Sequence, residues 1–228
     1  MQDGQMVEVV PAILVKSRAE LLECIARVRE SVSVVHIDIM DNEFVPNKTI
    51  GLESLAELPN GVSYEFHWMV KTPERWIVKI NGNHLHLVHV ETINEENWGA
   101  LKKICARSGC RLGLVLKPET TIEKLGPYIK DVSRVLVMAV HPGFYGQEYI
   151  PDVEEKIRAL RARFPKLEIE VDGGVNPETA GRACGAGANV LAAASAIYSA
   201  KNPRVAIKNI SAAGTRGAAS GAKTVTGE

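Results

Sequence analysis

Two histidines and two aspartates stand in the sequence where their side chains could share one metal ion. His36 and Asp38 are two residues apart in an apolar run, so in a strand they point to the same face, roughly 6–7 Å apart. His67 and Asp172 each lie toward the end of another apolar run. Imidazole with carboxylate suits zinc, iron(II), manganese or cobalt better than calcium or magnesium. One such residue alone is more often a hydrogen-bonded core histidine or a helix cap, but four together favour a site for one divalent metal.

Glycines that follow two further apolar runs could bring backbone amides close to an anion. Residues 142–147 read PGFYGQ, residues 172–175 read DGGV, and Ser195 follows the last run. Glycine allows such a close approach, and barrels often bind phosphate in loops of this kind. Methionine ends three of the runs, where it either fills the core or forms an apolar lining that excludes water, at Met40, Met69 and Met138.

Apolar runs alternate with amphipathic segments along the chain, and this alternation predicts eight strands and eight helices. The strands are expected over 7–15, 32–40, 62–70, 84–90, 111–117, 134–140, 168–171 and 189–194. The helices are expected over 17–30, 52–58, from Pro73 onward, and over 94–107, 122–129, 153–163, 177–185 and 203–210. Strands that alternate with helices form a parallel sheet. An open doubly wound sheet is the alternative, but the count of eight and the lack of a GxGxxG turn after the first strand favour a closed α/β fold, the (β/α)8 TIM barrel.

The composition limits the other properties of the chain. A single barrel domain is expected over residues 1–214, followed by a flexible tail over 215–228 because that segment is small, polar and rich in glycine. Lys+Arg and Asp+Glu each number 27, which gives no electrostatic argument for a nucleic-acid partner. No signal segment is visible, and no apolar run approaches the roughly 20 residues that span a bilayer. The four cysteines form no CxxC pair. A cytoplasmic protein with free thiols and no membrane or nucleic-acid partner is expected.

Five segments of the chain resemble ribulose-phosphate 3-epimerases, in order and spacing, from about residue 9 to residue 197: VHIDIMD with FVPN, FHWMV, VMAVHPGF, IEVDGGVNP and ASAI. The resemblance implies a barrel of the ribulose-phosphate-binding type. It also implies a metal-dependent enzyme that interconverts D-ribulose 5-phosphate and D-xylulose 5-phosphate through an enediolate. One divalent metal would be held by His36, Asp38, His67 and Asp172, with Asp38 and Asp172 as the two acid/base groups. Contacts with the sugar phosphate are implied for His67, Met40, Met69, Met138, Gly143, Phe144, Tyr145, Gly146, Gly173, Gly174, Ala194 and Ser195. Members of this family are often homo-oligomeric, so an assembly of identical chains is expected.

The chain departs from the family pattern mainly where the substrate would bind. Ala12 replaces a common serine, and the usual glycines are replaced at Asn42, Tyr145 and Ala194. Trp68 replaces a leucine or methionine, and by alternation it should face away from the pocket. Because the metal and proton-transfer residues are intact, these changes bear on the substrate more than on the reaction. The alternatives are 3-epimerisation of a hexulose 6-phosphate such as allulose 6-phosphate and a catalytically silent sugar-phosphate-binding barrel. A third alternative is an aldolase-type barrel in which Lys117 forms a Schiff base with the substrate. A lone lysine is better explained as a side chain that extends its ammonium group to the solvent.

Overall fold

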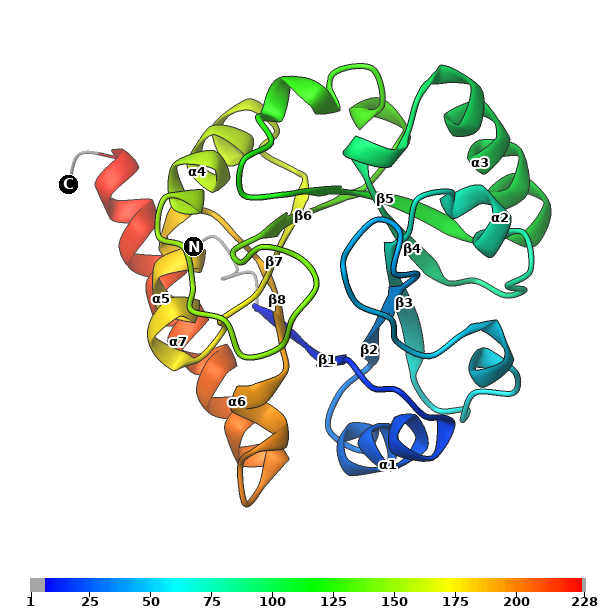
Figure 1. Cartoon of the computed structure of the whole chain (residues 1–228). Helices are drawn as coiled ribbons and strands as arrows, with labels where there is room; N and C mark the ends of the chain where they lie inside the picture. Colours follow the sequence, from blue (N-terminus) through cyan, green and yellow to red (C-terminus); the bar gives the residue numbers. More distant parts are fainter. Residues whose placement is uncertain (1–6, 227–228) are drawn as a thin grey trace.

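Eight parallel strands close into a barrel in the computed structural model, which describes residues 7–226 (Figure 1). The strands follow chain order around the barrel, and β1 pairs with β8 to close it. Their bounds are β1 Glu8–Ile13, β2 Val34–Met40, β3 Ser63–Met69, β4 Leu85–His89, β5 Arg111–Leu116, β6 Arg134–Met138, β7 Glu168–Asp172 and β8 Val190–Ala193. The predicted single (β/α)8 barrel is confirmed.

The α-helices lie outside the sheet, as Figure 1 shows, with short 3-10 turns in several connections. The α-helices are α1 Arg18–Val28, α2 Pro73–Ile77, α3 Glu95–Ser108, α4 Val153–Arg163, α5 Pro177–Ala186, α6 Ser195–Tyr198 and α7 Pro203–Thr226. The 3-10 turns are η1 Leu52–Leu55, η2 Val90–Thr92, η3 Ile122–Leu125 and η4 Ile129–Asp131. The helices expected over 52–58 and 122–129 begin where predicted, but they are shorter and are 3-10 helices, η1 and η3. Gly126 is still helical and donates to the Glu123 carbonyl, but Pro127 after it has no backbone N–H with which to continue the series.

The last helix, α7, is much longer than the segment 203–210 expected for it. Its later part is rich in glycine, which suggested a tail, but there the glycines let α7 lie directly against α5. A Cβ atom on Gly217 would overlap the backbone carbonyl of Gly181. Residues 215–226, expected to be part of a flexible tail, are helical here, and the flexibility of the segment stays a prediction. Residues 227–228 lie outside the described part of the chain.

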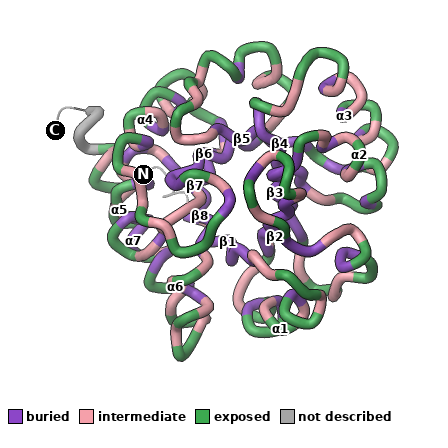
Figure 2. Tube along the Cα trace, in the orientation of Figure 1, coloured by how far each residue is buried: buried purple, intermediate pink, exposed green. Residues whose placement is uncertain are grey.

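The apolar core has two parts, because alternate residues of each strand face the helices or the barrel interior. Figure 2 shows the buried strands surrounded by helices with exposed outer surfaces. Trp68 lies in the outer part, fully buried beside Trp76 of α2, with its Nε1 donating to His86 Nδ1 at 3.0 Å. Its expected direction, away from the pocket, is confirmed. Of the described helices, none has the combination of length and apolar composition needed to cross a membrane.

Candidate metal and substrate site

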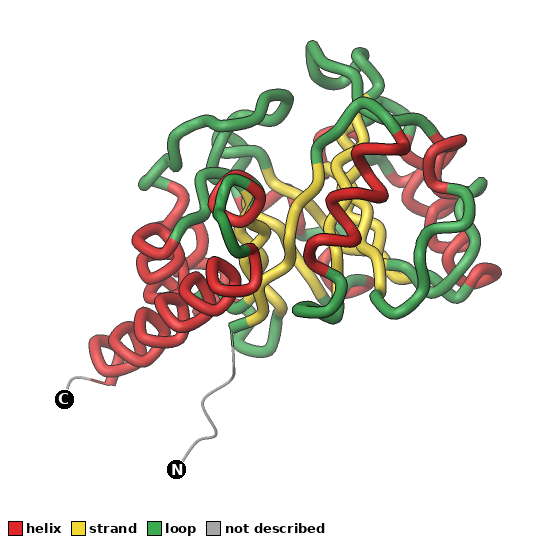
Figure 3. The backbone as a smooth tube through the Cα atoms, turned by 90° about the horizontal axis from the view of Figure 1, so that it is seen from below, coloured by secondary structure: helices red, strands yellow, loops and turns green. Residues whose placement is uncertain are grey.

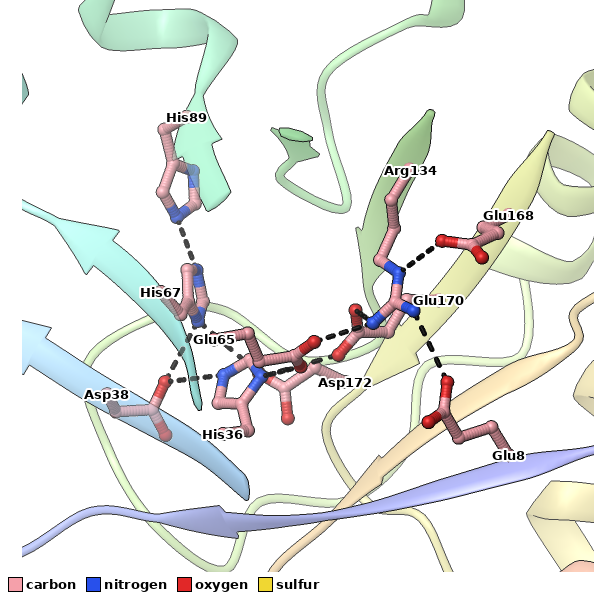
Figure 4. Close-up of polar contacts among 10 residues, drawn as sticks. All are labelled: Glu8, His36, Asp38, Glu65, His67, His89, Arg134, Glu168, Glu170 and Asp172. Atoms are coloured by element: carbon pink, nitrogen blue, oxygen red, sulfur yellow. Dashed lines mark hydrogen bonds and ion pairs between the residues drawn. The ribbon is translucent and has the colours of Figure 1, made fainter. Parts of the chain in front are cut away.

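The four predicted metal ligands converge inside the barrel, toward the carboxyl ends of β2, β3 and β7 (Figure 4). One donor atom from each side chain lies within 4.8 Å of the donors of the other three. Asp38 Oδ1 is 3.3 Å from His36 Nε2 and 2.9 Å from His67 Nδ1. His67 Nδ1 is also 3.8 Å from Asp172 Oδ2. The strand register produces this convergence, since Asp38 pairs directly with His67 across β2 and β3.

The two aspartates have opposite electrostatic environments. Burial acts to raise the pKa of Asp38, but hydrogen bonds and charge from His36 and His67 outweigh it and lower that pKa below its ordinary 3.8. Burial, followed by the negative charge of Asp38, raises the pKa of Asp172 to about 6. Two neighbouring carboxyl groups whose pKa values are pushed apart can act as a base and an acid. The chemistry of a proton exchange between two groups is therefore available here.

The same four side chains fit a divalent cation. Within the described residues, the ion pairs of Asp38 and Asp172 involve histidines alone, so no lysine or arginine neutralises these two carboxylates. Two nearly buried carboxylates that approach each other without such a partner are costly, and a metal ion removes that cost. Two imidazole nitrogens with two carboxylate oxygens are a donor set typical of zinc, iron(II), manganese or cobalt.

A second buried group, His36, Glu65 and Glu170, also brings possible ligands within 4.8 Å, but an arginine already occupies its surroundings. Arg134 enters from β6 and its Nη1 lies 2.5 Å from Glu65 Oε2 and 3.4 Å from Glu170 Oε2. Its other nitrogens contact Glu8 and Glu168 (Figure 4). Burial and then the charge of Glu65 raise the pKa of Glu170 to about 8. The guanidinium supplies the positive charge here, so this group is a structural ion-pair network.

Both metal-site histidines have a second partner that the sequence reasoning missed. His36 Nδ1 lies 2.7 Å from Glu65 Oε1, and His67 Nε2 lies 2.9 Å from His89 Nε2. Hydrogen bonding to Asp38, Glu170 and Glu65 outweighs burial and raises the pKa of His36 well above 6.5. Period-two alternation was the available signal for Glu65, which shares the inward face of β3 with His67. For His89 the signal was its place at the end of the strand expected over 84–90.

A cavity opens beside these ligands at the rim of the barrel, and all predicted sugar-phosphate contacts except His67 line it, together with Asp38 and Asp172. His67 is fully buried in the metal-ligand cluster. Figure 3 shows that long loops extend beyond the strands at this end. Gly174 must be glycine, since its φ is +63° and a Cβ atom would lie 2.7 Å from the backbone nitrogen of Tyr149. Whether these residues contact a sugar phosphate stays a prediction.

The residues that depart from the family pattern lie in different surroundings, and Tyr145 lines the cavity whereas Ala12 does not. Asn42 has φ 64°, a left-handed conformation that asparagine tolerates better than most residues, so it can stand in for glycine there. Tyr145 is 51% exposed and lines the cavity. Ala12 is buried in β1 beside His36 in register and does not line the cavity. Lys117 holds its ammonium group 4.1 Å from the centre of the Phe44 ring, also outside the cavity lining.

Known proteins match the chain over most of its length. A sequence profile of the ribulose-phosphate 3-epimerase family matches residues 8–198. A ribulose-phosphate 3-epimerase, cytoplasmic isoform, from Oryza sativa subsp. japonica is 37% identical, covering 86% of this chain and 89% of the relative. One from Chlamydia muridarum is 36% identical, covering 85% and 89%.

Solved structures show the same fold at much lower identity. The 3-hexulose-6-phosphate synthase from Salmonella typhimurium superposes with a TM-score of 0.67 at 15% identity, covering 92% of this chain and 99% of that one. At that identity the likeness concerns the fold alone. The sequence matches, together with the barrel and its cluster of ligands, lead to one conclusion: the chain belongs to the ribulose-phosphate 3-epimerase family and is an isomerase that acts on carbohydrates.

Proposed function

We propose that this enzyme interconverts D-ribulose 5-phosphate and D-xylulose 5-phosphate by moving the proton on C3 between two carboxyl groups. The observation that carries the proposal is the placement of Asp38 and Asp172 in one cluster with His36 and His67, beside a cavity at the carboxyl ends of the strands. Epimerisation next to a ketone needs a base on one face of the carbon and an acid on the other.

Asp38, ionised because its pKa is lowered, removes the proton from C3 in one direction. Asp172, whose pKa is about 6, carries the proton that is returned to the opposite face, and the roles exchange in the reverse direction. When bound by the four ligands, the divalent ion supplies Lewis acidity that stabilises the negative charge of the enediolate. Met40, Met69 and Met138 line the cavity and keep water away from that charge. Zinc, iron(II), manganese and cobalt all suit the donor set.

The substrate's phosphate is proposed to bind near Gly173, Gly174 and Ser195, at the ends of β7 and β8. A hexulose 6-phosphate such as allulose 6-phosphate is a second candidate substrate. Tyr145 in the cavity wall favours testing it, because its side chain changes the space in which a sugar would be held. Ala12 lies outside the cavity lining and gives no such argument. We further propose a homo-oligomer, because members of this family are often homo-oligomeric. The name of the rice relative, a cytoplasmic isoform, supports a place in the cytoplasm.

The test is isotope exchange at C3 in deuterated water. Protein stripped with a chelator and reloaded with each of the four metals is incubated with either ketose phosphate, and NMR follows both deuterium uptake and epimer formation. We expect exchange and epimerisation of the pentulose phosphate at least tenfold faster than of the hexulose phosphate. Asp38→Asn and Asp172→Asn should lower the rate by orders of magnitude.

Faster turnover of the hexulose phosphate would move the assignment to that sugar. Binding of sugar phosphate with no exchange under any metal would show a silent binding barrel and refute the proposal. Epimerisation that survives in Asp172→Asn would contradict the two-carboxylate mechanism even if the substrate is correct, whereas deuterium uptake without inversion is what the remaining Asp38 should still give.

A further inference from the structure

A chain of hydrogen-bonding groups leads outward from His67. Its Nδ1 faces the carboxylates of the metal site, 2.9 Å from Asp38 Oδ1, and its Nε2 lies 2.9 Å from His89 Nε2. His89 Nδ1 lies 3.1 Å from Glu91 Oε2. Both imidazoles are fully buried, so water cannot replace either contact. The chain therefore joins a metal ligand of β3 to an acidic residue that follows β4.

The two rings meet edge to edge. Their centroids are 5.1 Å apart and their planes differ by only 23°. With the two Nε2 atoms at 2.9 Å, that centroid distance matches two rings placed end to end, sharing one hydrogen in the ring plane. Two N–H groups would collide there, and two lone pairs would repel. One of the rings must donate and the other must accept.

Glu91 decides which ring donates. Its carboxylate has no proton to give, so His89 Nδ1 must carry the hydrogen toward it. The other oxygen of Glu91 is held by the Lys117 backbone N–H at 3.2 Å and by the Thr120 hydroxyl. A neutral imidazole with hydrogen on Nδ1 has its lone pair on Nε2. His89 therefore accepts, and His67 donates from Nε2.

In neutral His67 this order leaves the lone pair on Nδ1, the nitrogen that faces Asp38 and Asp172. The proton that Nδ1 shares with Asp38 at 2.9 Å has to leave when a cation binds there, while the hydrogen on Nε2 stays. We propose that His89 and Glu91 are positioning residues that hold His67 in the one tautomer able to bind a divalent cation at this site. The inference rests on the proposed metal-dependent function. Phe44 packs against the His89 ring at 4.7 Å between centroids and helps to fix it. His36 has a shorter connection, because Glu65 accepts directly from its Nδ1.

Three variants separate hydrogen bonding from packing. His89→Phe keeps a planar ring of similar size and removes the acceptor. His89→Gln retains an amide oxygen near the place of Nε2. Glu91→Gln leaves an amide that can donate to His89 Nδ1 and so reverse the order of donors along the chain. His86→Asn is the matched control, because His86 is also fully buried in β4 but accepts from Trp68 on the helix side of the sheet.

The measurement is the dissociation constant for Co²⁺ of the chelator-stripped full chain, by competition with a chromophoric chelator, together with the visible absorption spectrum of bound cobalt. We expect His89→Phe and Glu91→Gln to weaken binding by about 10- to 100-fold and to alter the spectrum, because partners of a ligating histidine have effects of that size. His89→Gln should recover most of the affinity, and His86→Asn should match the wild type.

Wild-type affinity and spectrum in Glu91→Gln, or equal losses in His89→Phe and His89→Gln with far-ultraviolet circular dichroism unchanged, would overturn the inference while leaving the proposed function intact. A wild-type protein that binds no cobalt and exchanges no C3 proton would overturn both. Because Glu91 is partly exposed, with 21% of its side chain accessible, its substitution tests the idea even if His89→Phe does not fold.

Discussion

Replacing Asp172 by asparagine should stabilise the metal-free protein at neutral pH while abolishing activity. The ordinary pKa of an aspartate is 3.8, and burial together with the charge of Asp38 raises the pKa of Asp172 to about 6. A group whose pKa is higher in the folded state contributes stability below its unfolded pKa, and this contribution is lost as the pH rises through the folded value. Above pH 6 the wild-type fold therefore carries the cost of a buried carboxylate that asparagine does not have.

The size of this cost follows from the difference between the two pKa values. At about 1.4 kcal/mol for each pH unit, it is about 3 kcal/mol in the free energy of unfolding at pH 7.5, and close to zero near pH 4. For a chain of this length that corresponds to roughly 6–12 °C in Tm. Thermal and urea unfolding of chelator-treated wild type and Asp172→Asn at both pH values measure the difference directly.

Adding zinc should reverse the order, because a ligand that binds only the folded wild type stabilises it in proportion to its affinity. Asp152→Asn is the control, since Asp152 is exposed at the start of α4 and caps nothing with its side chain. It should change the stability by no more than a few tenths of a kcal/mol at either pH. If Asp172→Asn is no more stable than the wild type at pH 7.5 without metal, the two aspartates do not share a buried, uncompensated site, and the electrostatic reasoning fails.

Two further substitutions, with Gly99→Ala as a control for the second, test the proposed ligands and the last helix. His67→Ala should mainly weaken metal binding, with activity partly recovered by excess metal; unchanged metal content by atomic emission would show that His67 is not a ligand. Gly217→Ala should lower the free energy of unfolding by about 1–3 kcal/mol, because the new Cβ atom overlaps the carbonyl of Gly181 in α5. Gly99→Ala in α3 meets nothing within 4 Å and should instead gain roughly 0.5–1 kcal/mol. Neither glycine variant should change kcat/KM, and equal stabilities for the two would contradict the packing of α7 on α5.

The ligand positions could be predicted because each depends only on local pattern. His36 and Asp38 share a face by alternation, and the parallel arrangement of strands brings His67 to the same end of the barrel. The positions of the four possible metal ligands and of the residues that line the cavity thus follow from strand ends alone. Their ionisation does not, because the pKa of Asp172 depends on how far it is buried and on its distance from Asp38.

The supporting residues required knowledge of register between strands far apart in the sequence. Arg134 of β6 reaches Glu65 of β3 across the barrel interior, and no spacing in the chain predicts that contact. Likewise, the glycines of α7 look like a tail until α5 is placed against them, since only the close approach to Gly181 explains why a small residue suits Gly217. Composition did not reveal that the helix continues there, because packing, rather than helix propensity, stabilises that segment.

His36 belongs to both charged groups inside the barrel, the ion-pair network around Arg134 and the candidate metal site. Its Nδ1 contacts Glu65, whose charge is balanced by Arg134, while its Nε2 faces Asp38 in the metal site. Arg134 supplies the positive charge of the inner group, which consists of His36, Glu65 and Glu170. That group therefore holds the ring of His36 in one orientation without a metal ion. The outer group, with Asp38 and Asp172, has no such arginine among the described residues. A fixed positive charge beside Asp38 and Asp172 would occupy the place that the proposed reaction needs for a metal ion and the sugar. Because Arg134 lies in the inner group instead, the two aspartates stay free to bind that ion and to move the proton.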